Sequence, residues 1–379
     1  MPFFLSQKCS LKWLETPSVY NIETDELYNL DYESFEFLKA CSSDDGGHSD
    51  DRKFTEYCIA EGILITEKVS VRRPPLVRSL FPSLRYLELQ ITDRCNLKCR
   101  HCYIDEEMKS ELSSDEIKKA LCEFEKMQGL RLLITGGEPL LHRQFAEIND
   151  MLPMFSFRKV LLTNGTLIKK ALLRGLNVHE IQISIDGLED AHDLLRGKGN
   201  FRASLCAIRD CLQEGVDVSV STMVHRANLH DFDAMEKLFR ELGIRDWTVD
   251  VPCPAGRMEF NKELQIRPEE GGGLLSYGHG GGIHGGEPGY ACGLHLASVS
   301  AGGKVSKCTF YSRNPAGSVA EGLDACWQRI IPVRLDTLKC ECEHLEVCRG
   351  GCRYRAEILE GPLGRDLYRC SLYDIMESG

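Results

Sequence analysis

Hydrophobic positions follow two different periods along the middle of the chain. Between residues 85 and 251, short apolar runs rich in Leu, Ile and Val alternate with longer segments in which apolar residues recur every three or four positions. The first pattern predicts buried strands and the second predicts amphipathic helices. We expect six strands, at Arg85–Ile91, Leu130–Thr135, Arg158–Thr163, Glu180–Ile185, Asp217–Met223 and Asp246–Val251.

The segments between these strands carry helix signals. The helix expected over Ser114–Met127 has Ser113 or Ser114 as its N-cap and Glu116 in its first turn. Strict alternation of strands and helices is typical of a parallel sheet with right-handed crossovers, which places the region in the α/β class.

Residues 1–70 predict a separate small α+β module. Short β-like pieces at Ser18–Tyr20 and Glu26–Tyr28 precede helical stretches at Tyr32–Cys41 and Lys53–Glu61, and a β-like ending covers residues 62–65. The predicted order is therefore β-β-α-α-β.

Three further segments follow from composition. Residues 71–84 carry three prolines and are interpreted as a linker to the region 85–261. Residues 262–291 contain ten glycines without apolar periodicity, so we expect a mobile bridge or lid. We expect His279 and His284 to be solvated there, and a ligand role for them is the alternative. Residues 292–379 form a module rich in cysteine.

Charge and cysteine content narrow the possible functions. A formal net charge of −11 argues against a nucleic-acid partner and against a basic membrane-binding patch. The sequence lacks both an apolar run long enough for a membrane span and a signal-peptide pattern at MPFFLSQKCSLKW, so we expect a cytoplasmic protein without a membrane partner. Because disulfides seldom persist there, 18 cysteines indicate metal clusters.

The most specific motif follows the first predicted strand. Cys95, Cys99 and Cys102 form a C-x₃-C-x₂-C run. Three thiolates leave a tetrahedral structural zinc site one ligand short, but they can hold three irons of a [4Fe–4S] cube and leave the fourth iron open to a small molecule. A zinc knuckle or chance clustering is the alternative interpretation. The run Gly136-Gly137-Glu138-Pro139 ends the second predicted strand.

This pairing of motifs resembles the radical S-adenosylmethionine (radical SAM) enzymes. The resemblance implies a partial (β/α)₆ barrel that holds a [4Fe–4S] cluster on Cys95, Cys99 and Cys102 together with S-adenosylmethionine. It also implies that His101 stacks on adenine, and that the Gly136-Gly137-Glu138 segment binds the amino group of the methionyl moiety. Family positions that contact the ribose and the carboxylate correspond to Asn164, Ser184, Asp186 and Arg196. Taken alone, each of these four is a polar turn residue.

The C-terminal cysteines resemble the SPASM domain, which binds two auxiliary [4Fe–4S] clusters. The resemblance assigns Cys292, Cys308 and Cys352 to the inner cluster and assigns Cys340, Cys342, Cys348 and Cys370 to the outer one. The family usually separates the first two outer cysteines by two residues, whereas Cys340-Glu341-Cys342 leaves one, which puts Cys340 in doubt or implies a local bulge. Cys253 between two prolines is a candidate fourth ligand for the inner cluster, which otherwise stays open for a substrate thiol. Zinc is an alternative for any four of these thiols.

The resemblance implies an enzyme that cleaves S-adenosylmethionine reductively to a 5′-deoxyadenosyl radical, with electrons from a ferredoxin- or flavodoxin-type reductant. The leading hypothesis is oxidative modification of a ribosomally made precursor peptide or protein substrate. The N-terminal module resembles PqqD-like winged-helix elements that bind leader peptides, and a packing cap on the barrel is the alternative.

Two rival functions stay open on the sequence. Gly350-Gly351-Cys352-Arg353-Tyr354-Arg355-Ala356 resembles a run of haem-pathway enzymes, so a cofactor-pathway enzyme of haem or PQQ type is one of them. A non-catalytic iron–sulfur electron carrier is the other. A sulfatase-type maturase fits less well, because Thr309 stands where those relatives place an aspartate base.

Overall fold

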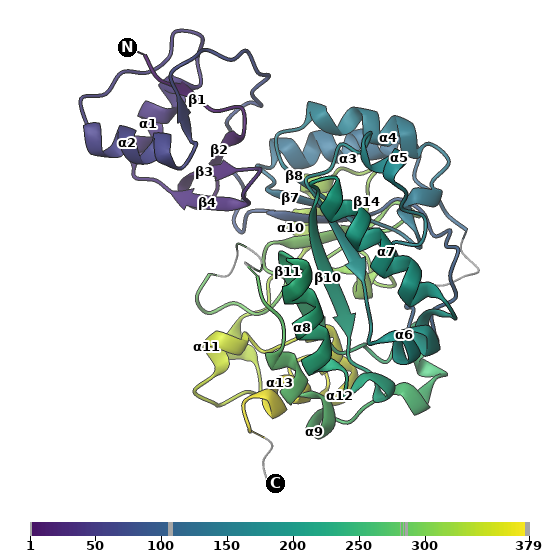
Figure 1. The fold of residues 1–379 in the computed structure, drawn as a ribbon. Helices are drawn as coiled ribbons and strands as arrows, with labels where there is room; N and C mark the ends of the chain where they lie inside the picture. Colours follow the sequence, from purple (N-terminus) through teal and green to yellow (C-terminus); the bar gives the residue numbers. More distant parts are fainter. Residues whose placement is uncertain (1, 105–108, 281, 283, 285–286, 376–379) are drawn as a thin grey trace.

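A nine-stranded sheet organises the computed structural model, which describes residues 2–104, 109–280, 282, 284 and 287–375. Its strand order is β11-β10-β9-β8-β7-β6-β12-β13-β14, and Figure 1 shows helices flanking it and the N-terminal module to one side. Six strands run parallel, as predicted, and their bounds are β6 (Tyr86–Gln90), β7 (Arg131–Thr135), β8 (Arg158–Thr163), β9 (Glu180–Ser184), β10 (Asp217–Met223) and β11 (Asp246–Asp250).

The sheet continues into the cysteine-rich segment. Strand β12 (Leu296–Val299) pairs in parallel with β6, and β13 (Lys304–Ser306) and β14 (Gly317–Ser318) follow in antiparallel pairing. The expected module boundary at residue 292 therefore runs through a continuous sheet, because β12 joins the barrel at the free edge of β6.

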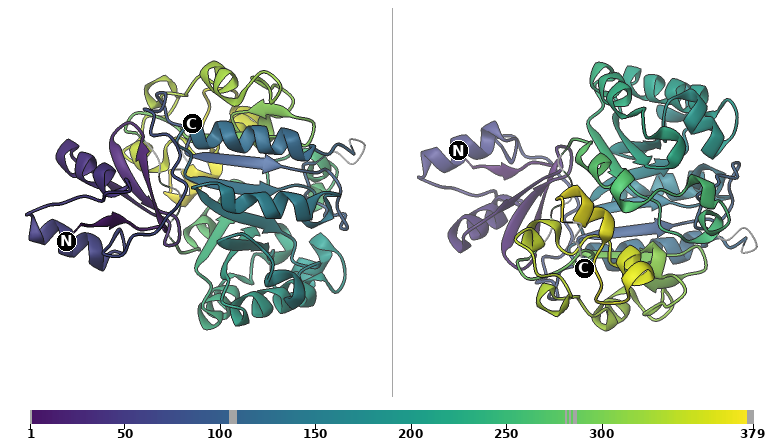
Figure 2. Two further views of the ribbon diagram at one scale, coloured as in Figure 1. Left: turned by 90° about the horizontal axis from the view of Figure 1, so that it is seen from above. Right: turned by 90° about the horizontal axis from the view of Figure 1, so that it is seen from below.

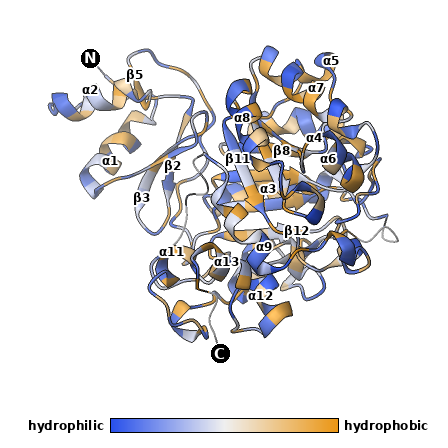
Figure 3. Ribbon diagram, turned by 60° about the horizontal axis from the view of Figure 1, so that its bottom comes forward, coloured by the Kyte–Doolittle hydropathy of each residue, from blue (hydrophilic) through white to orange (hydrophobic). Residues whose placement is uncertain are grey.

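Amphipathic helices cover the outer face of the parallel strands. Figure 2 shows them on the sheet from two further directions, and Figure 3 shows hydrophobic and hydrophilic residues side by side along them. Leu87 and Leu89 of β6 pack into the same core as Ile117, Leu121 and Phe124. The helices are α3 (Ser114–Lys126), α4 (Phe145–Met151), α5 (Lys170–Leu173), α6 (Glu189–Arg196), α7 (Asn200–Gln213) and α8 (Phe232–Leu242), with short turns η1 (Pro139–Leu141), η2 (Leu152–Met154) and η3 (Arg226–Asn228).

Helix α3 begins where the sequence predicted. The Ser113 side chain accepts from the Glu116 backbone N–H, and the Glu116 carboxylate accepts from the Ser113 N–H, which completes a capping box. The apolar positions of α3 then face the sheet with a helical period.

The N-terminal module contains two strands that the sequence interpretation missed. Its elements are β1 (Phe4–Leu5), β2 (Cys9–Trp13), β3 (Pro17–Asn21), β4 (Glu26–Asn29), α1 (Tyr32–Cys41), α2 (Arg52–Ala60) and β5 (Leu64–Ile65). β1 pairs with β5, and the three-stranded sheet β2-β3-β4 is antiparallel. The observed order is thus β-β-β-β-α-α-β.

Strand β2 was missed because it contains a buried lysine. The side chain of Lys12 is enclosed between the module and the barrel, where its Nζ donates to the carbonyls of Gly129 at 2.7 Å and Ser156 at 3.0 Å. Burial lowers the pKa of Lys12 to about 7. A lysine interrupts the apolar pattern that predicts a buried strand. The carbonyls that accept hydrogen bonds from Lys12 are distant in the sequence, so the sequence alone did not indicate that this lysine is buried.

The turn between β3 and β4 docks on the amino ends of the barrel strands. Arg158 Nη1 donates to the carbonyls of Ile22 at 3.0 Å and Glu23 at 2.7 Å, and Arg131 forms an ion pair with Asp25. Arg245 donates to the Thr24 carbonyl at 2.6 Å. The module is therefore attached at the end of the barrel opposite the carboxyl ends of the strands.

The glycine-rich segment holds more structure than predicted. It includes η5 (Lys262–Leu264), α9 (Pro268–Gly271) and η6 (Gly273–Ser276), and η4 (Gly256–Glu259) precedes it. His279 and His284 are partly buried rather than solvated, and each ring contacts a backbone carbonyl, of Ile244 and Asp25 respectively.

The C-terminal part consists of short helices around the end of the sheet. They are η7 (Thr309–Tyr311), α10 (Leu323–Arg329), η8 (Leu335–Thr337), α11 (Leu345–Cys348), α12 (Arg353–Glu360) and α13 (Leu367–Leu372). Among the helices of the described residues, none is long and apolar enough to span a membrane.

Candidate functional site

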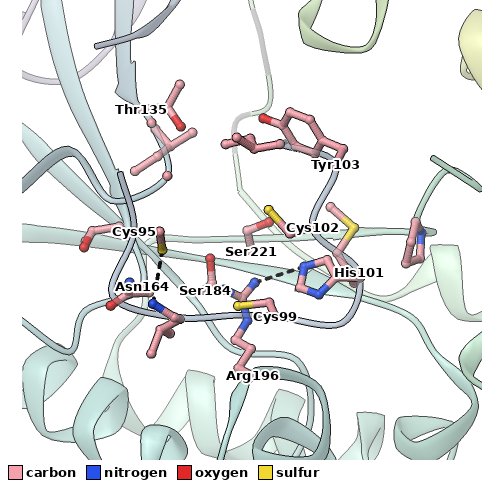
Figure 4. Close-up of a pocket in the computed structure, with 18 of the residues that line it drawn as sticks. Cys95, Cys99, His101, Cys102, Tyr103, Thr135, Asn164, Ser184, Arg196 and Ser221 are labelled. Atoms are coloured by element: carbon pink, nitrogen blue, oxygen red, sulfur yellow. Dashed lines mark hydrogen bonds between the residues drawn. The ribbon is translucent and has the colours of Figure 1, made fainter. Parts of the chain in front are cut away.

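A cavity of about 220 Å³ lies at the carboxyl ends of the parallel strands, where loops of α/β proteins converge on a ligand. Cys95, Cys99 and Cys102 line it together from the single loop after β6 (Figure 4). Burial raises the pKa of the Cys95 thiol to about 11 and also raises that of Cys99. The three thiols that the sequence singled out therefore share one enclosed space.

Gly136 and Gly137 hold the cysteine loop in place. The Gly137 N–H donates to the Thr92 carbonyl at 2.8 Å, and a Cβ added to Gly137 would lie 2.5 Å from the Arg94 carbonyl oxygen. A Cβ on Gly136 would lie 2.7 Å from the Thr92 carbonyl oxygen. Both glycines also line the cavity, so they combine close backbone approach with access to a ligand.

Glu138, for which the resemblance implied a contact with the methionyl amine, is not among the residues that line the cavity. Its carboxylate accepts from the Thr163 hydroxyl at 2.8 Å and from the Asn164 backbone N–H at 3.0 Å. The residue is fully buried, which raises the pKa of its carboxyl. These bonds tie the end of β7 to the end of β8, so Glu138 shapes the cavity wall from behind.

Asp186 is fully buried and is also not among the residues that line the cavity. Its carboxylate pairs with Arg196 Nε and accepts from the Met223 N–H at 2.7 Å. Burial opposes ionisation of Asp186, but the Arg196 guanidinium, the nearby histidines and the hydrogen bond from the Met223 N–H together outweigh it and hold the pKa of that carboxyl well below its usual range. Arg196 itself lines the cavity, so the pair presents the cation to the ligand.

His101 offers a neutral, uncommitted ring atom to the cavity. Burial, followed by the Arg196 charge, lowers the pKa of His101 to about 3. Its Nε2 lies 3.5 Å from Arg196 Nη2, and its Nδ1 has no hydrogen-bond partner among the described residues. Asn164 and Ser184 line the same cavity.

Three polar residues of the barrel interior escaped the sequence interpretation. Glu88, Gln182 and Ser221 lie within strands β6, β9 and β10 and line the cavity. Burial raises the pKa of Glu88, and the Thr309 side chain lies within hydrogen-bonding reach of it. The alternation of side chains along each strand could have identified these three residues, because each lies on the face opposite the outward apolar residues. A search for motifs does not detect this alternation.

Cys253 lies against the C-terminal thiols. It is buried, it lines the cavity, and its thiol shares a hydrogen bond with Cys352 that lowers the pKa of Cys352 to about 7. Burial and the nearby Cys352 raise the pKa of Cys292 to about 11. The pKa of Cys308 rises to about 12, first through burial and further through Cys292 and Cys352. We call Cys253, Cys292, Cys308 and Cys352 the inner thiol group.

A second set of cysteines surrounds another cavity, of about 620 Å³. Cys340, Cys342, Cys348 and Cys370 line it, and we call them the outer thiol group. The short spacing of Cys340 and Cys342 does not separate them in space, because both face this cavity. Among the described residues, no three His, Cys, Asp or Glu side chains are grouped as ligands of a single metal ion.

Comparison with known families decides what kind of site this is. Residues 89–239, which contain the cysteine loop and most of the cavity wall, match the radical SAM superfamily. These residues form a radical SAM domain. This confirms the predicted family and the expectation of an enzyme, and it removes the non-catalytic electron carrier.

Relatives and solved structures extend the likeness beyond this domain. The Fe-coproporphyrin III synthase of Methanosarcina barkeri is 26% identical over 353 residues, which cover 74% of this chain and 86% of that protein. The mycofactocin maturase MftC of Mycolicibacterium smegmatis is 28% identical over 305 residues, which cover 70% and 77%. Streptococcus suis SuiB, solved with its precursor peptide SuiA, shares the fold at a TM-score of 0.68 and 14% identity, over 96% of this chain and 98% of that one.

The radical SAM family implies a [4Fe–4S] cluster and S-adenosylmethionine, and the cavity suits both. Three thiols from one loop are the donor set of a cube with one open iron. The unpartnered His101 Nδ1 and the charged Arg196 provide polar contacts, and the glycine backbone provides close approach.

Proposed function

We propose that this radical SAM enzyme oxidatively modifies a ribosomally made precursor peptide. The observation that carries the proposal is the N-terminal module, which offers an exposed strand edge while it is attached to a barrel that bears two further thiol groups. The maturase name of a relative at 28% identity supports the same class of substrate.

The cavity residues divide into those that contact the cofactors and those that position them. We assign Cys95, Cys99 and Cys102 to the cluster and His101, Asn164, Ser184, Arg196 and the backbone of Gly136-Gly137 to S-adenosylmethionine. When bound, the two cofactors supply hydrogen abstraction from an unactivated carbon. Glu138 and Asp186 act indirectly, because one ties two strand ends together and the other fixes the guanidinium of Arg196.

We assign the inner and outer thiol groups to two auxiliary [4Fe–4S] clusters. Oxidation of a substrate after hydrogen abstraction releases one proton and one electron, and buried thiol groups beside the cavity suit an electron exit. Cys253 of the inner thiol group lines the cavity, and so does Phe310, which follows Cys308 by two residues. The inner thiol group is therefore nearer to a substrate in the cavity than the outer one is. A ferredoxin- or flavodoxin-type protein would supply electrons to the radical SAM cluster.

The edge of β4 is the proposed docking strand for the peptide. β4 lies at the border of the sheet β2-β3-β4, and extended peptides bind such edges through main-chain hydrogen bonds. Tyr57 and Ile59 on α2 are 49% and 43% exposed, and the ring of Tyr57 lies 6.4 Å from that of Tyr28 on β4. The exposed Tyr57 ring therefore lies beside β4 and suits contact with a side chain of a bound strand.

A tetrapyrrole substrate is the second candidate function. The relative that supports it covers 74% of this chain and is named for Fe-coproporphyrin III. The Arg353 and Arg355 positions of the run that resembles haem-pathway enzymes bind protein groups here, so they offer no free cation to a porphyrin carboxylate. This favours the peptide.

Substrate-dependent cleavage separates the two candidates. Anaerobically reconstituted enzyme with dithionite and S-adenosylmethionine is supplied with a candidate precursor peptide from a neighbouring open reading frame or with an iron tetrapyrrole that is a precursor of Fe-coproporphyrin III, and 5′-deoxyadenosine and product mass are measured. We expect a mass loss of hydrogen from the peptide and binding weakened by Tyr57→Ala. Phe260→Ala is the matched control, because Phe260 is 84% exposed but lies outside the module. Turnover of the tetrapyrrole alone would overturn the peptide proposal.

A further inference from the structure

One buried arginine joins the segments that carry the inner and outer thiol groups. Arg355, near the start of α12, is 1% exposed. Its Nε and Nη2 donate to the two carboxylate oxygens of Asp366 at 2.9 Å and 2.7 Å. A bidentate, fully buried pair of this kind fixes both orientation and distance.

The third nitrogen of Arg355 reaches the barrel. Nη1 donates to Asp250 Oδ1 and to the Val251 carbonyl, both at 2.9 Å. These acceptors end and follow strand β11, and Cys253 comes two residues after Val251. Arg355 therefore fixes the short segment that presents the Cys253 thiol.

Asp366 links Arg355 to the backbone of the inner thiol group. Its Oδ2 accepts from the Cys352 backbone N–H at 2.7 Å, and a Cβ added to Gly351 would lie 2.5 Å from the Asp366 Cβ. Asp366 also precedes α13, which carries Cys370 of the outer thiol group. The Arg355–Asp366 ion pair thus contacts the backbone of Cys352 and the segment that precedes Cys253, and it lies at the start of the helix that carries Cys370.

We propose that Arg355 is the positioning residue of the auxiliary centres, and that it holds Cys253 against Cys352 so that four thiolates close the inner cluster. The inference rests on the auxiliary clusters of the proposed function. A closed cluster has no open iron for a substrate thiol, so it serves electron transfer.

Arg353 provides a matched control two residues away. It is also buried, at 4% exposure, and it donates to the carbonyls of Gly350, Pro362 and Gly364. Among the described residues, its hydrogen bonds stay within the C-terminal segment and do not reach β11. Arg353→Lys makes the same chemical change in the same helix without touching the barrel.

The test compares reconstituted wild type, Arg355→Lys, Arg353→Lys, Asp250→Asn and Cys253→Ser in iron content, electron paramagnetic resonance and redox titration of the reduced clusters. We expect Arg355→Lys to change the signal and the midpoint potential of one auxiliary cluster in the same way as Cys253→Ser, with a weaker change in Asp250→Asn. The double variant of Arg355 and Cys253 should add nothing further. Arg353→Lys should keep the wild-type spectrum.

Two outcomes contradict the positioning role specifically. An unchanged spectrum and potential in Arg355→Lys, or an equal change in Arg353→Lys, would leave Arg355 as a packing residue. Wild type that binds iron for one cluster alone would instead refute the auxiliary clusters of the proposed function, and the inference with them. If Arg355→Lys fails to fold, Asp250→Asn decides, because it removes the charge pair between the arginine and the end of β11 and leaves the Val251 carbonyl and Asp366 in place. An unchanged spectrum of Asp250→Asn would then contradict the positioning role.

Discussion

The thiols at the barrel mouth and the inner thiol group are assembled in different ways. Cys95, Cys99 and Cys102 come from one loop of eight residues behind one strand. The inner thiol group comes from four separate places, after β11, before β12, after β13 and before α12. The first set needs correct local backbone, whereas the second needs distant segments to be held together.

The contacts that support each set reflect this difference. The mouth loop rests on two glycines of the neighbouring strand end, whose hydrogen bonds and close approach act within a few residues. The inner thiol group rests on a buried network of Arg355, Asp366 and Asp250. The residues that form such a loop are close together in the sequence and can be recognised as a motif. The residues that form such a network are far apart in the sequence and meet only in the folded chain.

The largest expected effect comes from removing a thiol at the mouth. Cys99→Ala should abolish S-adenosylmethionine cleavage, because a cube held by three thiolates loses its open-iron geometry when one is removed. The auxiliary iron should remain, since its ligands lie elsewhere. Iron analysis together with 5′-deoxyadenosine assay checks both statements. Loss of all iron, or unchanged cleavage, contradicts the separation of the two regions.

A glycine variant tests the local support of the same loop. Gly137→Ala places a Cβ 2.5 Å from the backbone oxygen of Arg94, closer than real contacts allow, so the loop must shift. We expect cleavage to fall more than about tenfold, because a displacement on the order of 1 Å already has effects of this size. Gly175→Ala is the control, since its Cβ would meet no atom closer than 3.8 Å. Equal rates in the two variants would show that the loop does not depend on Gly137.

The sequence predicted local features well and long-range ones poorly. All six barrel strands and the mouth cysteines were found, because alternation and spacing are properties of adjacent residues. Strand β2 was missed because Lys12 is buried only through its partners in the barrel. Glu138 and Asp186 were assigned to ligand contact because their positions at strand ends were visible, whereas their hydrogen-bond partners were not.

The placement of Asp186 leads to a prediction of intermediate size. Asp186→Asn keeps the shape but removes the charge that orients Arg196, so S-adenosylmethionine affinity should fall by about 1–3 kcal/mol, roughly 5- to 150-fold. Iron content should not change. Calorimetric titration of reconstituted enzyme measures the affinity, and Asp193→Asn on α6, the helix that ends at Arg196, is the control. Equal affinity of wild type and Asp186→Asn would show that Arg196 needs no partner.

The smallest expected effect is a dependence of folding stability on pH that originates in the barrel wall. Burial lowers the pKa of His192, packed behind the barrel wall, to about 4, while an unfolded histidine titrates near 6.5. Between these values the unfolded chain binds more protons than the folded one, so stability falls as pH falls. The slope is at most about 1.4 kcal/mol per pH unit for this one group.

Urea unfolding of the iron-free protein from pH 7 to pH 4 measures this slope. His192→Gln should flatten it, since glutamine offers an acceptor to the Asp186 N–H, as His192 Nδ1 does at 3.1 Å, without taking up a proton. His344→Gln in the outer part of the chain, where the histidine side chain is 36% exposed, is the control. If the two variants flatten the slope equally, acid sensitivity does not originate in the barrel wall, and the contrast between a locally built mouth and its surroundings loses this support.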